Sequence, residues 1–246
     1  MIDKLELNTK AQELREYLGE DANSPIDIFS LVPRIEGMTL VFHPLCNQIS
    51  GICVKNVKLI VINSKTSYGR QRYTLAHELY HLFYDNAGIT NICSMNIDSK
   101  NETEKNADLF ASYFLAPYKS LRAEANKFNN SLKLENVIYL EQYYGMSHLA
   151  MLWRLINEGY VSKDDFTEFS YKVKSKAKAL GYDDRLYNAL PDDKQRRTYG
   201  HYIALAEKIK ERELVSQGKI EELLLDAYRD DLVYGPDIEN SGEIID

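Results

Sequence analysis

The sequence predicts an α+β protein, in which a small antiparallel β-sheet packs on one long helix and a mainly helical C-terminal part follows. Short β-branched runs separated by polar turns predict three strands, at 38–42, 49–54 and 58–62. Residues 67–84 have the apolar spacing of a helix. From about residue 120 onward, the pattern is helical nearly to the end.

The first two elements are predicted to be helices that precede the sheet. Residues 9–19 show helical spacing and end at Gly19, and a second, short helix begins at Ser24-Pro25 and ends at Pro33. In helix 67–84 we expect four side chains to be buried, namely Leu75, Leu79, Leu82 and Phe83.

The segment that follows, 85–98, lacks periodicity and is interpreted as a loop, either a functional lid or a disordered tip. Residues 99–116 form a strongly amphipathic helix, whose predicted buried side comprises Ala107, Phe110, Ala111, Phe114 and Leu115. The later helices are expected at 119–128, 133–144, 147–158, 163–180, 194–216 and 218–231, before an acidic tail.

Composition limits the class of function. The chain has 246 residues and a net charge of −7, which argues against binding of nucleic acid through bulk charge. It has no apolar N-terminal run and no stretch long enough for a membrane span. Its three scattered cysteines, Cys46, Cys53 and Cys93, fit reduced thiols, so we expect a cytoplasmic location and no membrane partner.

The most informative motif lies in helix 67–84. His77 and His81 are four positions apart, so their imidazoles lie on one face of the helix and can hold a single zinc ion. Glu78, between them, can act as general base on a water that the metal activates. Zinc is the expected metal for two histidines and a carboxylate, with manganese or iron as alternatives.

A catalytic zinc needs a third protein ligand, which we expect on the following helix. Glu104 is favoured and Glu102 is the main rival, because either glutamate could instead close a capping box at the start of that helix. Asp108 is four residues after Glu104 and can accept a hydrogen bond from the distal nitrogen of a ligand histidine. Tyr84 and Tyr113 are candidates for the donor that stabilises the tetrahedral intermediate.

Four segments in order resemble the ImmA/IrrE family of zinc metallo-endopeptidases, namely ISGICV (49–54), IVINS (60–64), RQRYTLAHELYH (70–81) and EKNADLFASYFLAP (104–117). The resemblance covers roughly residues 10–160. It implies zinc ligation by His77, His81 and Glu104, with Glu78 catalytic. Two residues depart from the family pattern: Tyr80 replaces a common glycine and could crowd the metal, and Ala116 replaces a common methionine.

The resemblance further implies cleavage of a helix-turn-helix repressor of a mobile element, prophage or stress regulon, with the substrate strand pairing along the sheet edge. The expected organisation is a metalloprotease core over 1–120, a helix-turn-helix-like segment over 121–165 and a C-terminal helical region over 166–246. One alternative is a non-catalytic module that binds a regulator, as an antitoxin or sensor. Another is DNA binding through residues 133–161, in which 140–155 looks like a helix-turn-helix; it is disfavoured because Arg154 is the one basic residue between 145 and 161.

Overall fold

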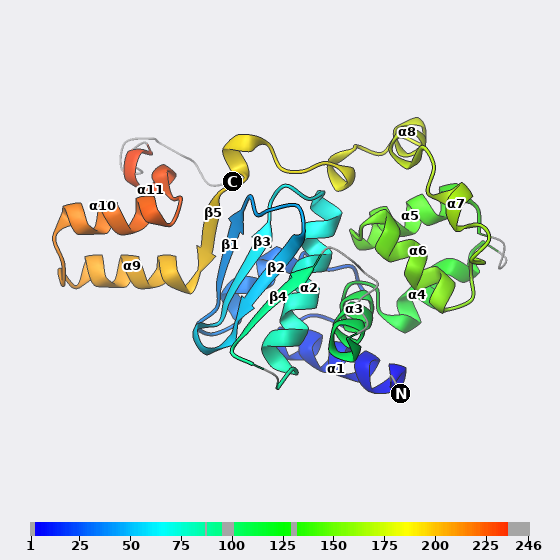
Figure 1. Ribbon diagram of the computed structural model, residues 1–246, viewed down its shortest axis with the longest axis horizontal. Coiled ribbons are helices and arrows are strands. Elements are labelled where there is room, and N and C mark those ends of the chain that lie inside the picture. The colour runs from blue at the N-terminus through cyan, green and yellow to red at the C-terminus, as the bar shows by residue number, and fades with distance from the viewer. Residues whose placement is uncertain (1–2, 87, 95–100, 129–131, 236–246) are drawn as a thin grey trace.

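A five-stranded sheet and the helices on one of its faces form the centre of the molecule (Figure 1). The computed structural model describes residues 3–86, 88–94, 101–128 and 132–235. The strand order is β4-β2-β3-β1-β5. The strands are β1 (Thr39–His43), β2 (Ile49–Val54), β3 (Leu59–Asn63), β4 (Thr90–Ser94) and β5 (Arg197–Gly200).

The sheet is mixed, which corrects the expectation of an antiparallel sheet. β1 and β3 run parallel, with Leu40 opposite Ile60, whereas the other three pairs are antiparallel. The cause is the path of the chain. After β1 it passes the position of β3 and forms β2 on the far side, and it then returns as β3 between the two. The apolar pattern of the three strands is the same for either arrangement, so their order could not be read from the sequence.

The helix that carries the histidines is α2 (Tyr68–Phe83), close to its predicted range. The Ser67 side chain accepts a hydrogen bond from the Arg70 backbone N–H and so caps its start. Leu75 and Leu79 are buried as expected, but Leu82 is half-buried and Phe83 is 38% exposed. The expectation for Phe83 was wrong because the last turn of α2 lies at the surface, where its ring contacts the exposed Tyr17.

Two further helices complete the layer that covers the sheet. α3 (Glu102–Leu115) packs against α2, and α1 (Lys4–Tyr17) packs against α3 (Figure 1). The five apolar side chains predicted for the buried side of α3 are all fully buried. Before the sheet, residues Ile28–Arg34 form a 3₁₀ helix with Pro33 inside it.

The interpretation of 85–98 as a loop holds for residues 85, 86, 88 and 89 but is wrong for residues 90–94. Thr90–Ser94 form β4, an edge strand that pairs antiparallel with β2, and residues 95–98 lie outside the described part of the chain. The strand is only five residues long and contains polar residues. Pairing with β2 therefore stabilises this strand, and the sequence pattern within the strand does not predict that pairing.

The remaining helices lie on two sides of this centre (Figure 1). On one side are α4 (Tyr118–Asn126), α5 (Leu134–Tyr144), α6 (His148–Asn157), α7 (Phe166–Phe169) and α8 (Val173–Ala179). On the other are α9 (His201–Glu211), α10 (Gln217–Asp226) and α11 (Asp230–Tyr234). Among the described residues, no helix is both long enough and apolar enough to cross a membrane.

Three of the predicted long helices are interrupted or shortened, among them the helix expected at 218–231, which is split into α10 and α11 with Tyr228 at φ 58° between them. The helix expected at 163–180 is split into α7 and α8, with Lys172 in the left-handed region at φ 53° between them. The helix expected at 194–216 begins only at His201, because Arg197–Gly200 form β5 at the other edge of the sheet. Gly200 has φ +87°, and a Cβ there would collide with the Met38 carbonyl, so only glycine allows this transition.

Candidate metal centre

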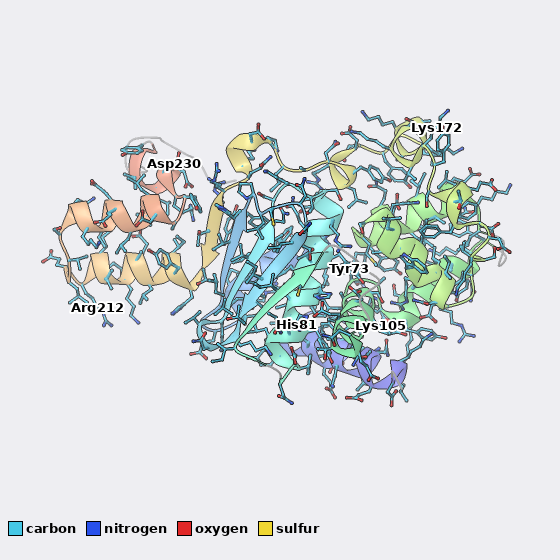
Figure 2. All side chains as sticks on the ribbon, viewed as in Figure 1. Tyr73, His81, Lys105, Lys172, Arg212 and Asp230 are labelled. Atoms are coloured by element: carbon cyan, nitrogen blue, oxygen red, sulfur yellow. The ribbon has the colours of Figure 1, made fainter. Side chains whose placement is uncertain are left out.

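Three of the predicted site residues converge where α2 meets the first turn of α3. His77 Nε2 and His81 Nε2 are 3.1 Å apart. Glu104 reaches both, with 3.3 Å from its Oε2 to His77 Nε2 and 3.4 Å from its Oε1 to His81 Nε2. Figure 2 labels His81 at this junction, beside the sheet. The structure thus brings Glu104 to the histidines, whereas the rival Glu102 is exposed.

These distances fit one tetrahedral ion. A zinc ion with bonds of about 2.0–2.1 Å separates its ligand atoms by about 3.3 Å. The 3.1 Å between the two Nε2 atoms is close to that edge length, and each Nε2 lies 3.3–3.4 Å from a different oxygen of the Glu104 carboxylate, which is therefore near enough to both to supply the third ligand atom. Two imidazole nitrogens and a carboxylate oxygen are also the donor types that zinc prefers.

Each histidine is held by a carboxylate on its other ring nitrogen. His77 Nδ1 lies 2.9 Å from Asp108 Oδ1, as the sequence predicted for Asp108. His81 Nδ1 lies 3.0 Å from Asp85 Oδ2, a partner that was not predicted from the sequence. The same Asp85 oxygen accepts a hydrogen bond from Asn91 on β4 at 2.7 Å and lies 3.2 Å from Lys55 Nζ. Both histidine contacts turn Nε2 of the ring toward the common centre.

Glu78 is fully buried beside strand β2. A Cβ at Gly51 would approach the Glu78 carboxylate closer than 3.0 Å, so glycine at this position makes the space that the carboxylate occupies. Neither carboxylate oxygen makes a hydrogen bond of ordinary geometry to a described residue. Burial raises the pKa of Glu78 to about 7, which is suitable for a group that accepts and returns a proton near neutral pH.

The ligand candidates are coupled electrostatically. The hydrogen bond from His77 lowers the pKa of Glu104. Burial opposes a charge on His77, but hydrogen bonds to Asp108, Cys93 and Glu104 together raise its pKa well above the ordinary value. Burial and the neighbouring His77 lower the pKa of His81. The pocket therefore carries excess negative charge that one proton or one cation can compensate.

Cys93 completes the group and was not predicted. His77, His81, Glu104 and Cys93 each offer one ligand atom, and these atoms all lie within 4.8 Å of one another. Cys93 is on β4, in the segment interpreted as a loop, so no local pattern could place it here. Its opposite residue on β2 is Gly51, which lies against Glu78. The register of β4 on β2 therefore carries the thiol to the site.

The two tyrosines considered as oxyanion donors are engaged elsewhere. The Tyr84 hydroxyl donates to the Lys10 carbonyl at 3.0 Å, and the Tyr113 hydroxyl lies 3.5 Å from a Glu158 carboxylate oxygen. Tyr80, the replacement for a common glycine, packs its ring against Phe110 in the core and meets the His81 ring edge-on at 5.9 Å. It thus supports the histidine from the core side.

This geometry, with two histidines and a glutamate around one point and a buried glutamate beside them, defines a metallopeptidase-like site. In agreement, residues 34–155 match the model of the IrrE N-terminal-like domain, Peptidase_M78. Residues 34–155 thus match the IrrE N-terminal-like peptidase family, which agrees with the resemblance seen in the sequence. A search of curated proteins gave no significant match.

Proposed function

We propose that the protein is a zinc-dependent endopeptidase that cleaves a helix-turn-helix transcriptional repressor in the cytoplasm. The observation that carries the proposal is the convergence of His77, His81 and Glu104 at the separations of a tetrahedral ion, next to the buried Glu78. The peptidase family of residues 34–155 supports the reaction class. The choice of a repressor as substrate rests on the resemblance to the ImmA/IrrE family.

In this proposal His77, His81 and Glu104 hold the ion, while Asp108 and Asp85 fix the orientation of the two imidazoles. The bound ion would supply Lewis-acid activation of the scissile carbonyl and of the attacking water. Glu78 accepts the proton of that water on a carboxylate oxygen and returns it to the leaving amine. Burial raises the pKa of Glu78 in the site without an ion, and the bound cation would favour the ionised carboxylate, which is the form that accepts the proton.

The substrate is proposed to bind as an extended strand at the outer edge of β4. This strand is at the end of the sheet and borders the site through Asn91 and Cys93. An added strand would form main-chain hydrogen bonds with the edge and bring one of its peptide bonds to the ion.

Direct DNA binding is not part of the proposal. Arg154, the basic residue of the helix-turn-helix-like pair α5 and α6, is buried and pairs with Glu158 at 3.0 Å. It also lies over the Tyr113 ring, with 4.1 Å between its guanidinium carbon and the ring centroid. A guanidinium used in this way cannot contact a base edge.

The deciding experiment mixes the purified protein with the helix-turn-helix repressor encoded nearest to its gene and follows intact mass. Glu78→Gln is the test variant, because it keeps the shape of the side chain and removes the base. Glu102→Gln, an exposed glutamate of the neighbouring helix, is the matched control. We expect cleavage by the wild type and the control, and none by Glu78→Gln or after chelation.

The metal content of each variant is measured in parallel by elemental analysis, which also identifies the ion. Glu78→Gln should retain one zinc per chain. Full metal content without any cleavage by the wild type would favour the alternative, a non-catalytic module that sequesters a regulator.

A further inference from the structure

The inner side of strand β4 provides a thiol to the metal centre. Cys93 is buried, whereas its neighbour Ile92 is 64% exposed, so the strand directs Cys93 toward α2 and Ile92 toward solvent. The thiol interacts with His77 and faces the Glu78 carboxylate. It therefore lies between a ligand candidate and the proposed general base.

The pairing of β4 with β2 directs the Cys93 thiol toward His77 and Glu78. Ile49 on β2 pairs with Ser94 and Gly51 pairs with Cys93, so Ser50 is an extra residue on β2 at this position. Such a bulge changes the direction of the neighbouring side chains. The Ser50 hydroxyl donates to the Cys93 carbonyl at 3.2 Å, which ties the bulge to the cysteine backbone.

We propose that Cys93 is the fourth protein ligand of the bound zinc, so that the resting site is closed and becomes competent only when the thiolate leaves the ion. This inference rests on the proposed function, because it assumes the ion held by His77, His81 and Glu104. On binding, the thiol gives up its proton to solvent and the thiolate sulfur bonds to the ion.

The donor set fits this role. A structural zinc site is closed by four protein ligands, whereas a catalytic site leaves the fourth position to water. Zn–S bonds of about 2.3 Å place a sulfur roughly 3.6 Å from the other tetrahedral ligands. The ligand atoms of the four-residue group lie within 4.8 Å of one another, so the Cys93 sulfur would have to move by about 1 Å at most to reach this position. Among the four ligands themselves, one thiolate and one carboxylate carry two negative charges against the two positive charges of the ion.

A thiolate at the fourth position has a direct consequence for activity. It would occupy the place of the attacking water, next to Glu78. Because Cys93 belongs to the edge strand at which we expect the substrate to pair, a strand added to β4 could draw the sulfur off the ion. The protease would then remain latent until its own substrate binds.

The test uses Co²⁺ as a spectroscopic probe in the full chain. A sulfur ligand gives a thiolate-to-cobalt charge-transfer band in the near ultraviolet, while the visible d–d bands report a bound tetrahedral ion of any donor set. We expect both signals in the wild type. Cys93→Ser should lose the charge-transfer band and keep the visible bands. Cys53→Ser is the matched control, since Cys53 is another buried cysteine of the sheet but lies outside the four-residue group, and it should keep both.

A second measurement needs no variant and is therefore independent of folding. X-ray absorption at the zinc edge of the wild type should show one sulfur neighbour together with nitrogen and oxygen. We also expect zinc affinity in Cys93→Ser to fall at least tenfold, as measured against a competing chelator.

The outcomes separate the two proposals. Visible cobalt bands without a charge-transfer band in the wild type, or zinc with only nitrogen and oxygen neighbours, would overturn the role of Cys93 and leave the endopeptidase intact. A charge-transfer band that persists in Cys93→Ser would overturn it as well. Absence of any bound cobalt or zinc would instead overturn the metal site on which the proposed function depends.

Discussion

The orientation of the two histidines depends on single carboxylates. Asp108 holds Nδ1 of His77 at 2.9 Å, and Asp85 holds Nδ1 of His81 at 3.0 Å. Each carboxylate fixes the tautomer that leaves Nε2 unprotonated toward the centre and increases its basicity. The side chains of both aspartates are partly or largely shielded from water, which strengthens these contacts.

We therefore predict that Asp108→Asn and Asp85→Asn each weaken zinc binding by roughly 10- to 100-fold. The amide keeps the size of the side chain but loses the charge that supports the imidazole. Competition with a chromophoric chelator measures the affinity, and the exposed Asp164→Asn serves as the control. Affinities equal to that of the control would show that these contacts do not tune the site.

Gly51 is a residue whose lack of a side chain has a functional reason. A methyl group there would meet the Glu78 carboxylate and the Thr74 side chain closer than 3.0 Å. In Gly51→Ala we expect Glu78 to be displaced and cleavage to fall by about tenfold or more, which corresponds to about 1.4 kcal/mol of barrier. Zinc content should remain at one per chain, because three of the four proposed ligands, His77, His81 and Glu104, lie on α2 and α3.

Gly218→Ala is the control for this prediction. Gly218 is in helix α10, and a methyl group added there would have no neighbouring side chain within 4 Å, so alanine is accommodated. Cleavage should be unchanged, and the helix should gain roughly 0.5–1 kcal/mol. Full activity in Gly51→Ala would mean that the position of Glu78 tolerates displacement.

At the residue scale, local spacing predicted candidates on α2 and α3 but left Glu102 as a rival of Glu104, which the fold brings to the histidines. His77 and His81 share a helical face, and Glu104 with Asp108 follows the same four-residue rule on the next helix. Cys93 could not be found in this way, because it reaches the site through the pairing of β4 with β2. Asp85 is four residues after His81 and has the same spacing, but it follows the end of α2 at Phe83 and was not considered.

At the scale of elements, α1 is joined to the end of α3 by a buried arginine. Arg15 is fully buried and donates to the carbonyls of Phe114 at 2.6 Å and Asp21 at 2.8 Å, and also to that of Ser24. Burial lowers the pKa of its guanidinium. Three backbone carbonyls thus share one donor group, and this contact fixes the helix that carries Glu104.

We predict that Arg15→Met lowers the free energy of unfolding by about 2–4 kcal/mol, since buried carbonyls lose their donors while the volume is largely kept. Chemical denaturation measures the change. Arg212→Met, at the exposed end of α9, is the matched control and should alter stability by less than about 0.5 kcal/mol (Figure 2). A similar free energy of unfolding for both variants would show that water can replace the Arg15 guanidinium without loss of stability.

Sequence analysis located an element well where its buried side chains recur with the period of a helix. It missed the strands that form only because they pair with a distant part of the chain. α3 was located within a few residues, and its buried side was identified correctly, because Phe110 and Phe114 are four apart on an amphipathic helix. β4 and β5 were missed. Each has at most five residues and is stabilised at an edge of the sheet by a partner strand far away in the chain.

At the scale of the whole molecule, the C-terminal helices have a hydrophobic cluster of their own. Ala206, Ile220 and Leu224 form it between α9 and α10, separate from the main core. The junction consists of β5 and a few contacts, among them the stack of Tyr228 on His43 with ring centroids 5.7 Å apart. The metal centre lies in the main core, between α2, α3 and β4.

This separation predicts that a chain ending at Gly200 keeps its metal site. The truncation retains β5 and its pairing with β1, and it removes only elements that do not contribute to the four-residue group. A ligand that binds only the folded state stabilises it by about 2.7 kcal/mol at 100 times its dissociation constant. We expect the same zinc-induced increase in the free energy of unfolding for the full chain and for residues 1–200.

Denaturant titrations with zinc and with a chelator measure this increase. The full-length variant Leu224→Asp, which disrupts the small cluster without shortening the chain, is the control for loss of the C-terminal helices. If zinc stabilised the full chain but not residues 1–200 or Leu224→Asp, the C-terminal helices would have to be part of the structure that holds the ion. An equal increase in all three would assign the metal centre to the sheet, α2 and α3, and would leave the C-terminal helices for other contacts, such as those with the substrate.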